Sequence, residues 1–329
     1  MSGYDVIGIG NAMVDVIAQA DDTFLDLMGI EKGIMQLIEK DRAEVLYAAM
    51  KDRVEAPGGS VANTIAGLGA LGLSTAFIGK VKDDALGKFY AQGMKDAGTA
   101  FPNPPVPEAE APTSRSMIFV SPDGERSMNT YLGAGADLGQ DDVDGAVFEA
   151  GKILFLEGYL FDKPEGKTAF AAAAGLMKAA GGKSGITLSD PFCADRHRAD
   201  FKTLIAESMD FAIGNSAEWT TLYETDDLDA ALAQGAAVCD TVVCTRSGDP
   251  VMIRQGDTAV EVPVSAVTPV DATGAGDQFA AGFLFGLATG RQLDICGAMG
   301  VMAASEVIGH IGPRPRANIG AMFKEAGLT

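Results

Sequence analysis

Short apolar runs alternate with longer amphipathic segments along most of this 329-residue chain. Because near-continuous apolar runs suit strands covered on both faces, the pattern predicts an α/β fold with a mostly parallel sheet between helical layers. Two of the helical segments are followed by glycines, Gly72 and Gly290, that suit left-handed C-caps. The expected strands lie at 4–10, 75–81, 152–158, 185–190, 210–215 and 241–245, and the expected helices at 39–53, 60–72, 164–180, 226–238 and 274–290.

One region breaks this alternation and predicts a second, smaller sheet. Residues 116–120 and 126–131 flank the turn S-P-D-G-E, where proline and Asp-Gly favour an antiparallel hairpin. Residues 15–38 carry few helix signals and are expected to pair with it. We therefore expect a β lid over the carboxyl edge of the large sheet, where open α/β sheets bind ligands. The predicted division is a large domain of 1–14, 39–112 and 134–329 and a lid of 15–38 and 113–133.

Composition narrows the classes of function. Forty-five acidic against 25 basic side chains give a formal charge of −20, which repels nucleic acid and anionic membrane surfaces, so neither is an expected partner. The four cysteines form no CxxC pair, and the two histidines cannot complete a metal cluster with them; buried free thiols in a reducing compartment are expected. Neither a signal peptide nor a membrane span is visible, so we expect a cytoplasmic protein.

The sharpest chemical signal is the string VDATGAGDQF at 270–279, which opens a predicted helix. Gly274, Ala275 and Gly276 leave the backbone uncrowded, so several N–H groups can face one anion and stabilise a phosphoryl group in transfer. A carboxylate beside that anion, Asp277, is unfavourable unless it is used, and a general base for an attacking hydroxyl is the obvious use. The alternative is that Asp277 only caps the helix and the glycines only make a turn.

Two strings nearer the N-terminus predict binding of a hydroxylated substrate. In GGSVANTIAGLGALG, Gly58 and Gly59 let the backbone approach a ligand, and the Asn63 amide can donate to and accept from vicinal hydroxyls. The alternative is a glycine-rich helix packed on a strand. In GIGNAMVDV, Asn11 and Asp15 would share one face of a strand, where the carboxylate suits a cis-diol. A dinucleotide-binding fingerprint fails there, because a methionine stands at the third glycine position.

Two single residues complete the candidate site. Arg126, on the predicted lid hairpin, is placed to reach across and clamp phosphate charge in the transition state, whereas solvation is the alternative for a lone surface arginine. Tyr159 follows a predicted strand and could stack on a base or sugar, with packing as its alternative.

These strings, in this order, resemble the PfkB (ribokinase-like) family of carbohydrate and nucleoside kinases. The loop at 271–277 is similar to the family's D-T-x-G-A-G-D signature, with Ala272 where threonine is frequent, and G-G-S-V-A-N is similar to its sugar-contacting G-G-x-x-x-N. The resemblance implies a ribokinase-like three-layer α/β/α fold with a β-sheet lid, and an ATP-dependent kinase. It implies substrate binding by Asn11 and Asp15, and makes Asp271 structural or linked to a monovalent cation such as K⁺.

The resemblance also implies a nucleotide side. GNSAEW is similar to the family's N-x-x-E motif, which makes Asn215 and Glu218 the residues that govern Mg²⁺ and phosphate, with Glu218 acting through water. A helix cap is the alternative for this pair. CTRSGDP resembles the segment beneath the nucleotide, which implies ATP binding by Thr245, Ser247 and Gly248 and leaves the role of the intervening arginine, Arg246, open.

The acceptor is less well defined by the sequence. GNAMVD and ERSMNTYLGA are most similar to the adenosine-kinase branch, so the first choice is phosphorylation of the adenosine 5′-hydroxyl to give AMP. A sugar or sugar-acid kinase of the fructokinase, ribokinase or 2-keto-3-deoxygluconate kinase type is the alternative. A third is an inactive binding or regulatory member. The expected partners are ATP with Mg²⁺ and a small nucleoside or sugar, and the chain is expected to be a monomer or a homodimer.

Overall fold

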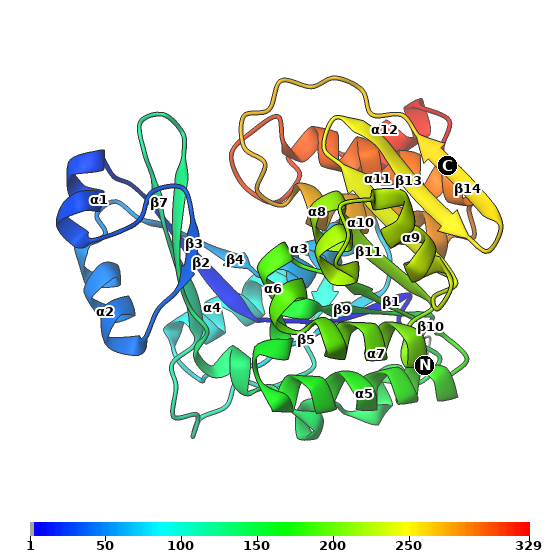
Figure 1. Ribbon diagram of the computed structural model, residues 1–329. Helices are drawn as coiled ribbons and strands as arrows, with labels where there is room; N and C mark the ends of the chain where they lie inside the picture. The colour runs from blue at the N-terminus through cyan, green and yellow to red at the C-terminus, as the bar shows by residue number, and fades with distance from the viewer. Residues whose placement is uncertain (1–2) are drawn as a thin grey trace.

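The structure is a computed structural model, and it describes residues 3–329. Its centre is a nine-stranded sheet in the order β14-β13-β12-β11-β10-β9-β1-β5-β6 (Figure 1). The strands from β12 to β6 pair in parallel, and β13 and β14 form an antiparallel edge. The strands are β1 (Val6–Ile9), β5 (Thr75–Ile78), β6 (Thr99–Ala100), β9 (Ile153–Glu157), β10 (Lys183–Thr187), β11 (Phe211–Asn215), β12 (Thr241–Arg246), β13 (Asp249–Gln255) and β14 (Thr258–Val262).

Successive residues of the central strands point into two different cores, as the period of a strand requires. In β9, Ile153 and Phe155 pack on one face, and Leu154 and Leu156 on the other. The first face is covered by α3 (Ser60–Ala70), α10 (Ala275–Ala288) and α11 (Leu293–Val307). The second is covered by α5 (Pro164–Ala179), α7 (Arg198–Ser208), α8 (Ser216–Tyr223) and α9 (Leu228–Ala236). The predicted three-layer fold is therefore confirmed.

Shorter elements connect these layers. They are α4 (Ala85–Asp96), α6 (Pro191–Arg196), α12 (Ile319–Glu325) and the 3₁₀ turns η1 (Gly133–Asp137), η2 (Gln140–Asp142), η3 (Gly145–Phe148) and η4 (Gly158–Asp162). The two predicted left-handed glycines are confirmed as well, since φ is +91° at Gly72 and +72° at Gly290.

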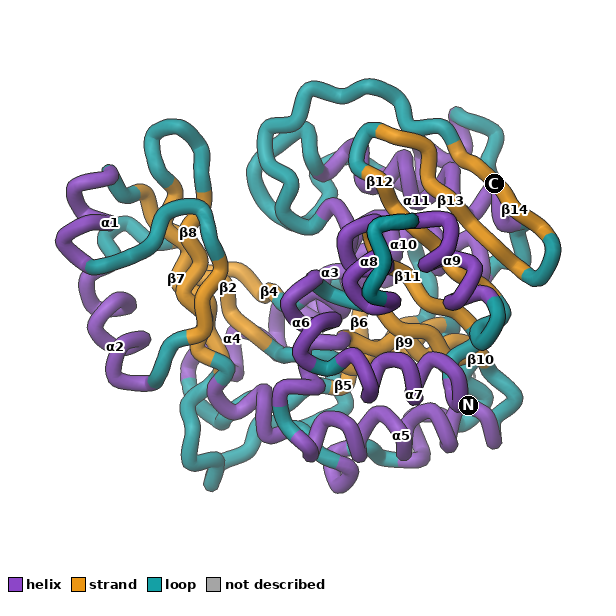
Figure 2. Tube along the Cα trace, viewed as in Figure 1, coloured by secondary structure: helices purple, strands orange, loops and turns teal. Residues whose placement is uncertain are grey.

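A second sheet of five strands, in the order β3-β8-β7-β2-β4, stands beside the large one (Figure 2). The predicted hairpin is confirmed, because β7 and β8 pair antiparallel. Two helices, α1 (Asp22–Met28) and α2 (Lys40–Ala49), cover the outer face of this sheet, away from the large domain (Figure 1). The strands are β2 (Met13–Gln19), β3 (Met35–Leu37), β4 (Val54–Gly58), β7 (Ser114–Val120) and β8 (Arg126–Tyr131).

The lid draws on more of the chain than the segments 15–38 and 113–133. The strand β4 pairs with β2 and the helix α2 contacts β7 and β8, although both elements fall in a stretch expected to belong to the large domain. Residues 15–38 also contain the helix α1, which the sequence reading missed. This helix has seven residues, too few for a clear period, and its caps define it instead: Asp21 Oδ1 accepts from Phe24 N at 2.8 Å, and Gly29 is left-handed.

The lid is attached at the carboxyl edge of the large sheet. Only residues 10–12 separate β1 from β2, so the chain passes from the large sheet directly into the lid. This corrects the expectation that Asn11 and Asp15 share one strand face: Asp15 lies on β2, but Asn11 lies in the link between the sheets. The same edge receives the start of α3, which follows β4.

Candidate active site

The loop before α10 forms a turn shaped for close approach. Gly274, the N-cap of α10, has φ +79°, and a Cβ there would lie 2.6 Å from the Cα and the carbonyl oxygen of Pro313. Glycine is therefore required at 274 by both conformation and space. A Cβ at Gly276 would meet nothing within 4 Å, so that side of the turn is open. The amide of Ala275 already donates to Ala272 O at 3.2 Å, which tightens the turn.

Asp277 lies in the first turn of α10 and is held by α3. Ser60 Oγ donates to Asp277 Oδ1 at 2.7 Å, and Asn63 Nδ2 donates to Oδ2 at 3.1 Å. Thr64 Oγ1 donates to the Asp277 carbonyl at 3.0 Å, which fixes the helix as well as the side chain. Burial raises the pKa of Asp277 to about 6, because desolvation outweighs the donors from Ser60 and Asn63. The structure thus joins the two predicted glycine-rich motifs at one carboxylate.

The predicted diol-binding residues lie next to this carboxylate. Burial raises the pKa of Asp15 to about 7, and the charge of Asp277 acts in the same direction, so the two carboxylates share one site. A Cβ at Gly58 would lie 2.4 Å from Asp15 Oδ2, and one at Gly59, where φ is +99°, would lie 2.2 Å from Asn11 O. Both glycines therefore leave room for the Asn11–Asp15 segment. The sequence had instead predicted that they let the backbone approach a ligand.

Glu157, at the end of β9, is a site residue that the sequence reading missed. Its side chain is 1% exposed and accepts three N–H groups: Asn11 N at 3.2 Å, Asn11 Nδ2 at 2.8 Å and Val61 N at 3.0 Å. Burial raises its pKa to about 7, against the effect of these donors. Glu157 thus ties the link between the sheets to the start of α3. The only sequence signal was an acidic residue ending an apolar strand.

Arg126 reaches from the lid to the turn before α10, as predicted for a clamping residue. Its guanidinium forms an ion pair with Asp271, and the two side chains are 9% and 7% exposed, so the alternative of a solvated arginine is wrong. Arg126 Nη1 is buried without a protein partner within residues 3–329, which suits an anion. Asp271 also accepts from Thr273 N at 3.0 Å and Gly312 N at 2.9 Å, which supports its structural role; its link to a monovalent cation stays a prediction.

The residues predicted to bind the nucleotide gather at the ends of β11 and β12. Asn215 and Thr245 are partners in the parallel register. Asn215 and Glu218 form a capping box, in which Asn215 N and Nδ2 donate to the two carboxylate oxygens of Glu218 at 2.8 and 2.6 Å. Ser247 is left-handed, with φ +54°, and a Cβ at Gly248 would meet nothing within 4 Å. Arg246 Nε donates to Pro250 O at 2.6 Å, so this arginine braces the β12–β13 hairpin.

The Glu218 site fits Mg²⁺ only through water. Both carboxylate oxygens are already hydrogen-bonded to Asn215, and no group of three or more His, Cys, Asp or Glu side chains within residues 3–329 is arranged to hold a metal ion. Burial raises the pKa of Glu218 to about 7, and the charged group acting on it is a second carboxylate, Asp190. A hydrated cation would offset this negative charge.

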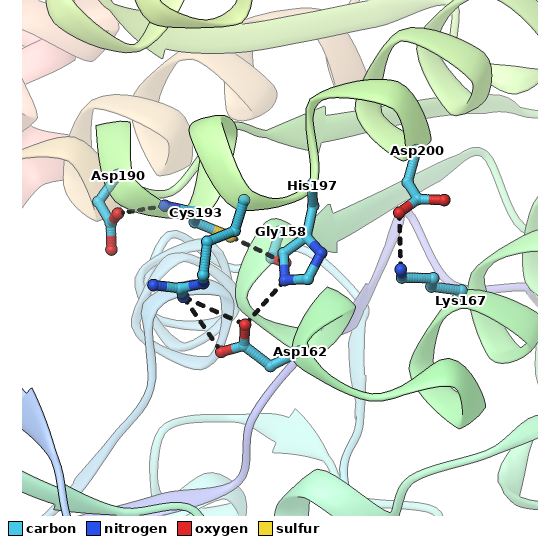
Figure 3. Close-up of polar contacts among 8 residues, drawn as sticks. Gly158, Asp162, Lys167, Asp190, Cys193, His197 and Asp200 are labelled. Carbon is cyan, nitrogen blue, oxygen red and sulfur yellow. Dashed lines mark hydrogen bonds and ion pairs between the residues drawn. The ribbon is translucent and has the colours of Figure 1, made fainter.

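Tyr159 lies on η4. Polar contacts of Gly158 and Asp162, at the two ends of η4, fix this segment (Figure 3). Cys193 Sγ contacts Gly158 O at 3.3 Å, and Asp162 pairs with His197 Nε2 at 2.8 Å. The Tyr159 hydroxyl donates to Ser189 O at 3.3 Å, and its ring packs on the second core. These contacts support packing, and stacking on a substrate stays a prediction. All four cysteines are buried free thiols, as expected.

A buried carboxylate beside an open, glycine-rich turn at one helix end suits transfer of a phosphoryl group to a small molecule. A family model described as pfkB family carbohydrate kinase matches residues 22–318. An adenosine kinase from Sinorhizobium meliloti is 46% identical, with a TM-score of 0.91 over 99% of this chain and 100% of that chain. A probable sugar kinase protein from Rhizobium etli CFN 42 is 42% identical, with a TM-score of 0.92 over 100% of both chains. Adenosine kinase 2 of Arabidopsis thaliana is 28% identical over 94% of this chain and 96% of its own length.

The chain belongs to the pfkB family of carbohydrate kinases and is accordingly an ATP-dependent kinase. Within residues 3–329, none of the helices combines the length and the apolar character that crossing a bilayer takes.

Proposed function

We propose that the protein transfers the γ-phosphoryl group of ATP to a hydroxymethyl group, with Asp277 as the general base. The observation that carries this proposal is the position of Asp277: its carboxylate is fixed by Ser60 and Asn63 within one residue of the open turn at Gly276. The raised pKa of Asp277 suits a group that must take a proton near neutral pH. In the first turn of α10 the Ala275 and Gln278 amides already donate to Ala272 O and Gly274 O, which leaves the Gly276 and Asp277 amides to stabilise the transferring group.

The lid and the nucleotide side complete this reaction. Arg126 brings a buried guanidinium with an unpartnered Nη1 to the turn, where it pairs with phosphate oxygens. Asn215 and Glu218 would hold Mg²⁺ through water, and Thr245, Ser247 and Gly248 would contact ATP. When bound, Mg²⁺ neutralises charge on the phosphates. Asp15 and the Asn11 segment bind the hydroxyls of the acceptor beside Asp277.

Adenosine is the proposed acceptor. The Sinorhizobium meliloti relative, similar over nearly the whole of both chains, is named an adenosine kinase. The partly buried Asp15, whose pKa is raised by desolvation, suits a ribose diol because two hydroxyl donors would compensate its charge. A sugar acceptor is the second candidate, since the similarly close Rhizobium etli relative is named a sugar kinase protein.

A coupled ADP-release assay separates these candidates. The purified protein is tested with Mg²⁺, ATP and, separately, adenosine, inosine, ribose, fructose and ketodeoxygluconate, with Asp277→Asn as the blank for contaminating kinases. We expect adenosine to give the highest kcat/KM. A higher value for a sugar would overturn the adenosine assignment, and folded, ATP-binding protein that turns over none of the five would favour an inactive member.

A further inference from the structure

The loop between α11 and α12 is fixed against the turn before α10. Gly312 N donates to Asp271 Oδ2 at 2.9 Å, and Gln278 Nε2 donates to Pro313 O at 3.1 Å. Farther along, Glu306 Oε1 accepts two backbone amides of the loop, at 3.1 and 2.8 Å. The turn and the loop are in such close contact that a Cβ at Gly274 would collide with the loop backbone. This loop is therefore a built part of the site.

One side chain of this loop, Arg314, points to the residues that hold the proposed base. Arg314 Nε donates to Asn63 Oδ1 at 3.2 Å, while Asn63 Nδ2 donates to Asp277 Oδ2 at 3.1 Å. An amide has one acceptor end and one donor end, and a guanidinium only donates. With Arg314 at the oxygen of Asn63, the NH₂ group must face Asp277. Without it, a flip of the amide would set an oxygen against the carboxylate.

Arg314 also faces the negative charge of the site. Three buried carboxylates gather here, Asp15 on β2, Glu157 on β9 and Asp277 on α10, and the charge of Asp277 raises the pKa of the other two. Arg314 lowers the pKa of both Asp15 and Asp277, against burial, and Arg126 from β8 acts on Asp15 in the same direction. Burial lowers the pKa of Arg314 itself, and the charges of Asp15 and Asp277 oppose that change.

The geometry points to Arg314 as a positioning residue for phosphoryl transfer: through the Asn63 amide it fixes the donor that faces Asp277, and it supplies positive charge between the acceptor side and the base. This inference rests on the proposed role of Asp277. A purely structural arginine is the competing explanation, since Arg314 Nη2 also lies 4.0 Å from Met94 Sδ and packs between α3 and α4. The two explanations differ in pH dependence, because packing alone would not move the ionisation of Asp277.

The test compares Arg314→Met and Arg314→Lys with wild type, and uses Arg316→Met as a control, an exposed arginine of the same loop. Steady-state kcat, KM and the acid limb of kcat/KM are measured from pH 5 to 9. For Arg314→Met we expect kcat to fall about 10–100-fold, KM for ATP to change little, and the acid limb to move to higher pH, because a cation that favours ionised Asp277 is lost. Arg314→Lys should keep the position of the acid limb and recover part of kcat. Arg316→Met should match wild type.

An Arg314→Met enzyme with the kcat and acid limb of Arg316→Met would overturn the inference. The Asn63 link is tested by a double-mutant cycle with Asn63→Ala, in which non-additive losses are expected and additive losses would refute the link. If Arg314→Met fails to fold, Arg314→Lys and its cycle decide the question. The assays use whichever acceptor the wild-type enzyme prefers, so a sugar preference would remove the adenosine assignment and leave the role of Arg314 open to the same test. An Asp277→Asn variant with normal turnover would instead remove the base on which the inference rests.

Discussion

Replacing Glu157 with Gln tests how the buried carboxylates of the site affect stability. The Glu157 side chain is 1% exposed, with three N–H donors on its two oxygens. Glutamine has the same shape but only one carbonyl oxygen, so its NH₂ group must face a donor, either at Asn11 or at Val61. That mismatch should cost about 1–3 kcal/mol of unfolding free energy. The pH dependence of stability that Glu157 contributes works against the wild type instead, because it lowers the stability of the wild type as pH rises.

The sign follows from the raised pKa of Glu157. Its ordinary value is 4.5 and its value in the fold is about 7, so between these two pH values the unfolded chain ionises while the folded protein stays protonated. Stability from this group is therefore fully present below pH 4.5 and is lost as pH rises to 7. At about 1.4 kcal/mol per pH unit the loss is at most roughly 3 kcal/mol. Glu157→Gln should not show this pH-dependent loss of stability, because glutamine does not ionise.

The measurement is urea unfolding of both proteins at pH 5, 6, 7 and 8, followed by the fluorescence of the single tryptophan, the buried Trp219. We expect the advantage of wild type over Glu157→Gln to shrink between pH 5 and about 7 and to level off by pH 8. The control is Glu207→Gln, at an exposed position. The difference in stability between wild type and this variant should not change with pH in this way. A gap that stayed constant or widened toward pH 8 would mean that the N–H donors outweigh desolvation, and would refute the reasoning.

Three further predictions concern the reaction itself. Asp277→Asn should bind ATP normally in calorimetry but lose about 10²–10⁴-fold in kcat, and near-normal kcat would remove its role as base. Asp15→Ala should raise KM for the acceptor far more than for ATP; equal effects on both in steady-state assays would argue against diol binding. Gly274→Ala should lower kcat strongly, because φ is +79° and a Cβ would lie 2.6 Å from Pro313, and a fully active variant would show that the turn tolerates rearrangement.

Features encoded over a few neighbouring residues could be predicted from the sequence. The apolar runs predicted the parallel strands, because a strand buried on both faces needs no polar alternation. The hairpin of β7 and β8, the left-handed Gly72 and Gly290, and the turn at Gly274 follow from local backbone preferences. The motif strings at Asn215 and Asp277 were visible for the same reason, since their residues lie within one helical turn.

What only the tertiary structure decided depends on contacts between distant parts of the chain. Asp277 meets Ser60 and Asn63 across more than two hundred residues, and Glu157 and Arg314 reach the same site from other strands and loops. Nothing in its immediate neighbours distinguishes Glu157 among 45 acidic residues, or Arg314 among 25 basic ones, because a buried charge is defined by its partners rather than by its own type. The pairing of β4 with the lid could not be predicted for the same physical reason. The alternation of side chains along a strand indicates which face is buried, but not which sheet the strand joins.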